Sequence, residues 1–184
     1  MRLNIDFGNR YEARSTPDLR VIQFNTVLKD ETFVPLKVEI SDGAHELLPN
    51  VYNFAFGPMD EKGRIDDKAK LTHKDYSKTF STILFAAITF LEAYPEYKLG
   101  IDGSTNGRAF LYYRAIQQNF DYLDKHFNIY GLKYYVRISR FGKTQYDDPF
   151  DFDDIGSATI KIEKGIKIPS DKMYNYFIFE LKNN

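Results

Sequence analysis

The sequence lacks cysteine and tryptophan, and the missing cysteine excludes disulfide bonds, thiolate nucleophiles and every cysteine-based zinc site. It also lacks an excess of charge of either sign: 25 Lys and Arg stand against 26 Asp and Glu, for a net charge of -1. A strongly basic protein attracts nucleic acid over much of its surface, and this composition provides no such field. Any recognition of charge must therefore depend on local groups.

Long apolar stretches are missing as well. The most apolar window, Ile83–Ile88, is much shorter than the roughly 20 residues that a membrane-spanning helix needs. The first residues, Met1–Asp6, show neither the apolar segment nor the small-residue cleavage pattern of a signal peptide. We therefore expect no membrane association and a cytoplasmic location.

The chain does contain enough apolar and aromatic material for a core. It has 184 residues, of which 43% are hydrophobic, and these include 16 Phe and 14 Tyr. A chain of roughly 150 residues already buries close to 70% of its unfolded surface. We expect one domain over residues 1–184, in which residues 1–10 carry an additional N-terminal strand, Leu3–Phe7.

Alternation of apolar and polar residues in the first third of the chain is typical of strands with one buried face. Strands are predicted there over Leu19–Leu28, Phe33–Ile40 and Val51–Phe56. Pro35 cannot donate a ladder hydrogen bond, so its strand should lie at a sheet edge or start late. The later strands are predicted over Tyr97–Asp102, Leu132–Ser139, Ala158–Ile162 and Tyr174–Leu181.

Apolar residues at helical spacing predict two main helices. The first is capped by Asp75 or Ser77 and carries its apolar stripe over Phe80–Leu91. The second is predicted over residues 105–127, with Phe127 as the last member of its stripe. Strands followed by alternating helices and strands indicate an α+β fold, with an antiparallel or mixed sheet and two main helices packed on one face.

Three stretches of the chain form a pattern when taken together. They are Val51–Gly57 followed by Gly63–Asp67; Gly103–Thr105 with Arg108, Leu111–Tyr112 and Ile116; and Tyr130–Leu132 near Tyr174–Leu181. The pattern resembles a family of small bacterial domains of unknown function, whose members share a strand, a Gly-Ser-Thr turn and a helix that bears Arg and Tyr. The resemblance spans roughly residues 11–182, and it implies one domain in a bacterial regulatory or defence setting without supplying a catalytic residue. The N-terminal strand and a long Asp-rich insert at Tyr146–Asp154 depart from the pattern.

The strongest local signal is the turn Gly103–Arg108 between a predicted strand and the second helix. Such a turn exposes backbone N–H groups at the positive end of the helix dipole, which suits an anion. Arg108 falls in the first helical turn, where a cation is unfavourable unless an anion lies close by, and a guanidinium group can grip phosphate in a bidentate fork. The turn has neither the spacing and lysine of a phosphate loop nor a dinucleotide-binding glycine pattern. The candidate ligand-binding residues are Gly103, Ser104, Thr105, Asn106, Gly107, Arg108 and Tyr112.

A purely structural interpretation of the same turn stays open. Ser104 or Thr105 would only cap the helix, since serine and threonine are common caps. Arg108 would then pair with Asp102 or with an acidic loop.

Two strand-end carboxylates, Asp6 and Asp102, give a second hypothesis. Nucleases with a ribonuclease H-like fold hold two divalent ions on strand-borne carboxylates. The sequence offers no third acidic residue at a recognisable position on a later helix, and Asp before Gly is a common turn element. We therefore expect no metal site at this pair, and a metal-dependent nuclease is the alternative function.

Other charged and polar groups give weaker signals. Asp147–Asp154 holds five aspartates in eight residues, but it lacks the central Gly and final Glu of a calcium loop. An exposed loop is predicted there, which a basic partner could meet. The histidines His45, His73 and His126 have no metal-ligand spacing, so neither a metal nor a cofactor is expected.

Adjacent tyrosines at Tyr112–Tyr113 and Tyr134–Tyr135 should leave one member of each pair more exposed. Exposed tyrosines near Arg108 and Arg114 suit single-stranded nucleic acid or a protein interface. The balanced charge favours the interface, including a homo-oligomer formed through exposed Tyr and Phe. Two classes of function therefore stay open: a module that binds a phosphate-bearing ligand, a nucleic acid or a protein partner, and the nuclease. The sequence does not decide whether the protein is an enzyme.

Overall fold

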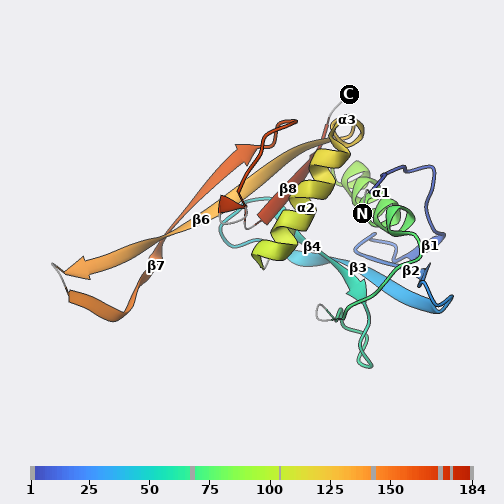
Figure 1. Cartoon of the computed structure of the whole chain (residues 1–184), viewed down its shortest axis with the longest axis horizontal. Helices are drawn as coiled ribbons and strands as arrows, with labels where there is room; N and C mark the ends of the chain where they lie inside the picture. Colours follow the sequence, from blue (N-terminus) through green and yellow to red (C-terminus); the bar gives the residue numbers. More distant parts are fainter. Residues whose placement is uncertain are drawn as a thin grey trace.

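The computed structural model describes residues 3–66, 69–103, 105–141, 144–169, 172–174 and 176–182, without the side chains of Asn106 and of residues 134–157. An eight-stranded sheet runs through this part of the chain in the order β1-β2-β3-β4-β5-β8-β6-β7. Figure 1 shows the sheet with its helices and a projecting arm. The strands are β1 (Ala13–Ser15), β2 (Val21–Val27), β3 (Phe33–Ala44), β4 (Val51–Pro58), β5 (Lys98–Asp102), β6 (Phe127–Phe141), β7 (Thr144–Lys161) and β8 (Tyr176–Leu181). The helices are α1 (Tyr76–Ala93), α2 (Asn106–Gln118) and α3 (Phe120–Leu123).

The strands predicted in the first third of the chain are confirmed as β2, β3 and β4. Among the described strand pairs, β4 and β5 run parallel and the others antiparallel. β3 is an interior strand that lies between β2 and β4, yet Pro35 is tolerated. It pairs with Asn25 of β2, while pairing with β4 begins at Leu36, so the missing N–H of Pro35 faces no neighbouring strand.

The first predicted helix is confirmed as α1. Asp75 is its N-cap, and the Asp75 side chain accepts a hydrogen bond of 2.8 Å from the backbone N–H of Lys78. The helix connects the parallel strands β4 and β5, as a crossover between parallel strands requires. Its buried face includes Phe90 and Leu91, both 0% exposed.

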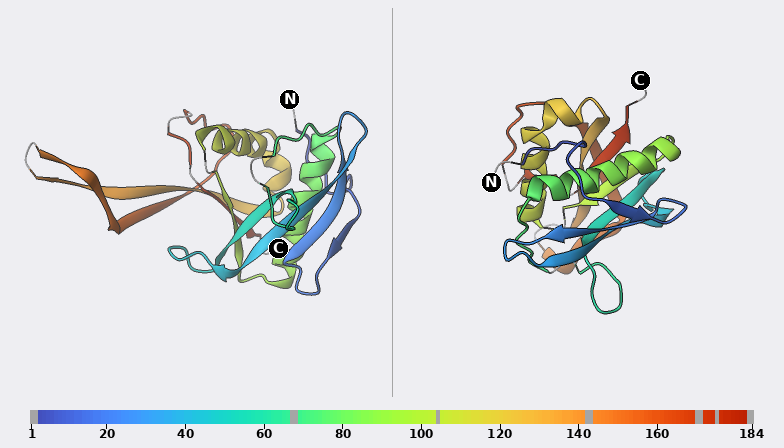
Figure 2. Two further views of the ribbon diagram at one scale, coloured as in Figure 1. Left: turned by 90° about the horizontal axis from the view of Figure 1, so that it is seen from below. Right: turned by 90° about the vertical axis from the view of Figure 1, so that its right-hand side faces the viewer.

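Both long helices cover the same face of the mixed sheet (Figure 2), so the predicted α+β fold is confirmed. Leu91 of α1, Ile116 of α2 and Phe177 and Phe179 of β8 belong to one apolar core. The opposite face of the sheet holds a second, small apolar cluster formed by Leu48, Val51, Leu132, Tyr176 and Ile178. Within the described residues, no helix has the length and apolar character needed to cross a membrane.

The second predicted helix, residues 105–127, is wrong in its second half. The helix is interrupted at Asn119, which lies between α2 and the short α3. Phe127 is already the first residue of β6. Asn119 is buried, and its side chain donates to the carbonyl of Ala115 at 2.9 Å and accepts from the amide of Ile5 at 2.8 Å. An asparagine that satisfies two separate backbone groups competes with the regular helix ladder, and the helix ends there.

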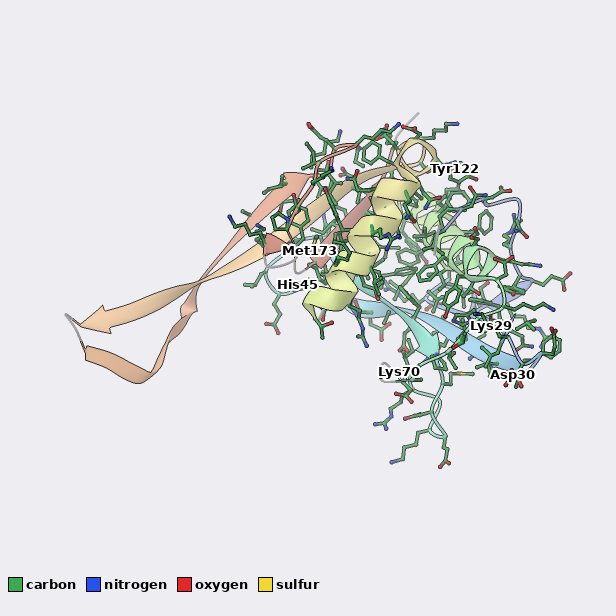
Figure 3. The ribbon with its side chains drawn as sticks, viewed as in Figure 1. Lys29, Asp30, His45, Lys70, Tyr122 and Met173 are labelled. Atoms are coloured by element: carbon green, nitrogen blue, oxygen red, sulfur yellow. The ribbon has the colours of Figure 1, made fainter. Side chains whose placement is uncertain are left out.

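The predicted N-terminal strand Leu3–Phe7 is also wrong, because this segment joins no strand. Ile5 and Phe7 are buried, as the alternation indicated, but the backbone amides of the segment donate to side chains of α1, α2 and α3. The acceptors are Gln118 for Leu3, Ser77 for Asn4, Asn119 for Ile5, Ser81 for Asp6 and Tyr122 for Phe7. Figure 3 labels Tyr122, which belongs to α3, at this end of the molecule.

The predicted exposed loop at Tyr146–Asp154 is a strand instead. It belongs to β7, which pairs with β6 from Phe141↔Thr144 to Tyr130↔Lys161 with two register shifts, so that of residues 146–154 only Phe150 and Asp151 pair with β6. β6 in turn pairs with β8 over Phe127–Leu132. Beyond this region β6 and β7 form a two-stranded arm that projects from the rest of the chain (Figures 1 and 2).

Candidate functional site

A cavity of about 200 Å³ lies where the parallel strands β4 and β5 separate. The two strands pair over Val51–Asn53 and Lys98–Gly100, after which β4 continues to pair with β3 as far as Pro58. The crevice beyond the carboxyl ends of parallel strands is the usual place for a ligand in sheets of this kind. The lining residues come from β4, the segment after it, the end of β5 and α2: Asn53, Phe54, Ala55, Phe56, Ile65, Ile101, Asp102, Arg108 and Tyr112.

One wall of the cavity depends on a close contact between Gly57 and Ile65. The chain turns back after β4, and the amide of Asp66 donates to the carbonyl of Pro58 at 2.8 Å. A Cβ atom at residue 57 would lie 2.9 Å from Cγ2 of Ile65, which is closer than real Cβ contacts come. Glycine at position 57 therefore lets Ile65 pack against β4 and line the cavity.

The predicted turn leads into α2 at the mouth of this cavity. Thr105 is the N-cap, with an extended backbone (φ -133°, ψ 151°), and its Oγ1 accepts from the amide of Arg108 at 3.2 Å. The capping part of the structural interpretation is thus confirmed for Thr105. Gly103 is buried, whereas Thr105 and Gly107 are exposed. Ser104 and the side chain of Asn106 lie outside the described residues.

Asp102, Arg108 and Tyr112 form the charged part of the cavity. Asp102 is exposed at the end of β5, but partial desolvation raises its pKa above the usual aspartate value, while Arg108 and His45 oppose part of that rise. Burial also raises the pKa of Tyr112, with Arg108 opposing the rise and Asp102 adding to it. The guanidinium of Arg108 therefore acts on both groups, and Arg108 and Tyr112 are one helical turn apart on α2. Asp102 and Arg108 are thus close enough to interact electrostatically.

The side chain of Asn53 is hydrogen-bonded by a residue of β8. The hydroxyl of Tyr176 donates to Oδ1 of Asn53 at 3.4 Å, and the ring of Tyr176 crosses β5 at Gly100. A Cβ atom at residue 100 would lie 2.0 Å from Cε1 of Tyr176, so the ring occupies the space of a side chain. His45 packs its ring against Tyr176 with centroids 5.6 Å apart.

The structure thus brings predicted site residues together at the cavity, but they form only one of its walls. Arg108 and Tyr112 line the cavity, while Asn53, Phe56 and Ile65 on the opposite side were not selected from the sequence. They fall in the two stretches, residues 51–57 and 63–67, that carried the family resemblance. The occurrence of these two stretches in the same family pattern as the Gly-Ser-Thr turn was the signal that could have identified Asn53, Phe56 and Ile65.

The second hypothesis paired Asp6 with Asp102, and the structure places these residues on different elements. Asp6 lies on the N-terminal segment, where its amide donates to Oγ of Ser81 on α1 at 2.9 Å and its carboxylate accepts from the amide of Gly8 at 2.8 Å. Asp102 ends β5 beside Arg108. Within the described part of the chain, no three His, Asp or Glu side chains are grouped so that they could hold a metal ion.

The expected exposed tyrosine surface on α2 is not present in that form. Tyr113 is 5% exposed and its hydroxyl donates to the carbonyl of Ile166 at 2.6 Å, while Tyr112 is half-buried in the cavity wall. The exposed apolar side chains of α2 are Phe110, at 40%, and Leu111, at 61%. The side chains of Tyr134 and Tyr135 lie outside the described residues.

Comparison with protein families matches residues 8–151 to a family described as a family of unknown function (DUF6934). The chain belongs to the DUF6934 family. No curated protein and no solved structure matches the chain. The match to DUF6934 agrees with the resemblance drawn from residues 51–57, 63–67 and 103–116.

The DUF6934 match, residues 8–151, covers the cavity but not the two ends of the chain. It includes β4, β5 and α2, so every residue that lines the cavity falls within the family region. The segment Leu3–Phe7 precedes the match, and β8 with Tyr176 follows it.

Proposed function

We propose that this DUF6934 protein is a binding module that holds a small phosphate-bearing ligand in the cavity between β4, β5 and α2. The observation that carries the proposal is the position of Arg108. Its guanidinium lines the cavity at the N-terminal end of α2, next to a carboxylate whose pKa burial raises. Arginine binds phosphate in a bidentate fork, and the positive end of the helix dipole favours the same anion.

The charge of Asp102 sets the balance at this site. While Asp102 is ionised, it stabilises Arg108 and repels an incoming anion. Asp102 is exposed, and the partial desolvation that raises its pKa weakens its competition with a phosphate group for Arg108. Asp102 is then suited to accept a hydrogen bond from a hydroxyl or amino group of the ligand rather than to contact its phosphate.

The size of the cavity limits the ligand. At about 200 Å³ it is smaller than the roughly 300–1,000 Å³ of pockets for drug-sized molecules. It suits a phosphate and its attached sugar, and the base of a nucleotide would extend out of the cavity. Phe56 and Ile65 provide apolar contacts, and Asn53 and Tyr112 provide hydrogen-bonding groups.

The test compares probes that differ in their phosphate. Inorganic phosphate, a nucleoside monophosphate and the matching nucleoside are titrated into the protein by calorimetry. We expect the monophosphate to bind most tightly and Arg108→Ala to weaken its binding by about 10- to 150-fold, the worth of a hydrogen bond to a charged group of about 1.5–3 kcal/mol. Asp102→Asn should tighten binding, because it removes the repulsion between carboxylate and phosphate.

Arg114→Ala is the matched control, since Arg114 is an exposed arginine on the same helix and does not line the cavity. Equal loss of affinity in Arg108→Ala and Arg114→Ala would mean that the phosphate is attracted only by general surface charge. Binding of the nucleoside as tightly as the monophosphate would contradict the proposed role of Arg108.

The nuclease alternative is checked in the same experiment. RNA and DNA are incubated with the protein in the presence of Mg²⁺ or Mn²⁺, and cleavage that disappears in Asp102→Asn would replace the binding proposal with the enzymatic one. We propose a cytoplasmic location for this binding module.

A further inference from the structure

A second cavity lies in the core between the two long helices and the sheet, and its volume is about 40 Å³. Residues of α1, α2, α3, β4, β5 and β8 line it, together with Ile5 of the N-terminal segment. Within the described chain, the atoms that face this cavity are apolar. A buried water needs about two to four polar partners, so the cavity cannot hold one in place. An apolar group suits it instead.

This apolar cavity adjoins the cavity that contains Arg108, which is called the polar cavity below. Phe56, Ile101 and Tyr112 line both of them. The ring of Tyr112 lies edge-on to Phe56, with centroids 6.1 Å apart, and edge-on to Phe177, with centroids 6.2 Å apart. Phe177 lines the apolar cavity and not the polar one. Tyr112 therefore marks the boundary, where its ring can face the core and its hydroxyl can meet polar groups.

The two cavities differ in their chemistry. Asn53, Asp102 and Arg108 line the polar cavity, and none of these three lines the apolar one. An apolar group that enters the core leaves water, and it supplies contacts that the atoms around an empty space lack. A hydroxyl group at the same place would lose its hydrogen bonds to water without finding a partner. A ligand that extends into both cavities therefore has one charged end and one apolar end.

We propose that the ligand is a phosphate monoester with a short apolar organic group, which passes Tyr112 and fills the apolar cavity while the phosphate lies at Arg108. This inference rests on the proposed function, because it requires the phosphate site. The apolar cavity has about three times the space that one water molecule occupies, so it accommodates about three carbon atoms. The sugar of a nucleotide carries hydroxyl groups and stays in the polar cavity.

Calorimetric titration of the full chain with linear alkyl phosphates of increasing length tests the proposal. The affinity should rise about fourfold with each added carbon, which is the worth of one buried methylene group. The rise should continue over about three carbons and then level off, because the apolar cavity is then full. Propyl phosphate should bind about tenfold or more tightly than glycerol phosphate, which has the same number of carbons but two hydroxyl groups.

Two variants change the size of the apolar cavity in opposite directions. Ala115→Val fills part of it from α2, so the rise with chain length should be lost while the affinity for inorganic phosphate stays the same. Ile83→Val removes one methyl group from the lining, so the rise should extend by about one carbon. Leu111→Val is the control for a β-branched residue in α2, because Leu111 is exposed and does not line the cavity.

The outcomes separate this inference from the proposed function. Alkyl phosphates that bind with an affinity independent of chain length, but more weakly to Arg108→Ala, overturn the apolar site and leave the phosphate site standing. A rise that persists unchanged in both Ala115→Val and Ile83→Val also overturns the inference, because the apolar group then binds elsewhere. Binding that depends on chain length and on residue 115, but not on Arg108, overturns the phosphate site and with it the proposed orientation of the ligand.

Discussion

The backbone amide of Ile5 donates to Oδ1 of Asn119 at 2.8 Å, across 114 residues of sequence. Both residues are buried, and the Asn119 side chain also donates to the carbonyl of Ala115. One side chain thus ends α2 and fixes the N-terminal segment over the core. A segment outside the sheet has no ladder to satisfy its amides, so side chains of the neighbouring helices must do so.

Replacing Asn119 tests this arrangement. Asn119→Ala leaves the buried amide of Ile5 without an acceptor, which should lower the free energy of unfolding by about 1–3 kcal/mol. Chemical denaturation measures the change, provided that the dependence of the unfolding free energy on denaturant concentration is the same in both proteins. Gln118→Ala is the matched control: its bond to the amide of Leu3 is exposed and 3.3 Å long, so its loss should cost less than about 0.5 kcal/mol. Comparable losses in both variants would show that Asn119 acts through helix propensity and not through Ile5.

The N-terminal segment also shows what alternation in a sequence does and does not predict. Leu3, Ile5 and Phe7 alternate with polar residues, and Ile5 and Phe7 are indeed buried. Alternation reports which residues face the core, but it does not report what satisfies the backbone. The acceptors are Ser77, Ser81, Asn119 and Tyr122, which look like ordinary polar helix residues until the chain folds.

The candidate site divides in the same way. The turn that ends in Arg108 is local, because a strand end, small residues and a helix cap follow one another in the sequence. The opposite wall comes from β4, about 50 residues earlier, and depends on a short parallel pairing that no local pattern encodes. The arm was missed for a related reason: the acidic segment has the composition of a loop, and of residues 146–154 only Phe150 and Asp151 pair with β6.

Thr105 provides a test that separates helix capping from ligand binding. Thr105→Ala removes the acceptor of the Arg108 amide and should lower the free energy of unfolding by about 1 kcal/mol. Thr105→Ser keeps a hydroxyl at the same position and should restore most of the loss. Thermal unfolding of the three proteins measures the effect, and a Ser variant as unstable as the Ala variant would contradict the capping role.

His73 predicts a pH dependence of stability. Burial lowers the pKa of His73 below its usual 6.5, and Nδ1 of His73 lies 3.0 Å from Oγ1 of the buried Thr26. As the pH falls through 6.5, the unfolded chain gains a proton at His73 while the folded protein keeps the imidazole neutral. The contribution is therefore complete above the unfolded pKa and is lost as the pH falls toward the folded pKa.

Denaturation of the wild type and of His73→Gln at several pH values between about 5 and 7.5 measures this dependence. The stability difference between the two proteins should shift in favour of the variant as the pH falls. A direct titration of the His73 ring by nuclear magnetic resonance provides the check. A midpoint at or above the ordinary histidine value would contradict the prediction.

Gly100 makes the last prediction, because its absent side chain leaves room for the ring of Tyr176. Gly100→Ala places a Cβ atom 2.0 Å from Cε1 and 2.3 Å from the hydroxyl oxygen of Tyr176, so the ring or β5 must move. Overpacking of this kind typically costs about 1–3 kcal/mol. Gly43→Ala is the control, since nothing lies within 4 Å of a Cβ atom there, and it should be close to neutral.

A double-mutant cycle assigns the loss to this contact. In a Tyr176→Ala background the added methyl group meets no ring, so Gly100→Ala should then cost little, and the coupling between the two positions should equal most of the single-variant loss. Gly100→Ala should also weaken ligand binding at the cavity, because displacing the Tyr176 ring releases the side chain of Asn53. An undiminished cost of Gly100→Ala in the Tyr176→Ala background would instead place the strain in the backbone of β5. In that case the ring of Tyr176 would have no part in positioning Asn53.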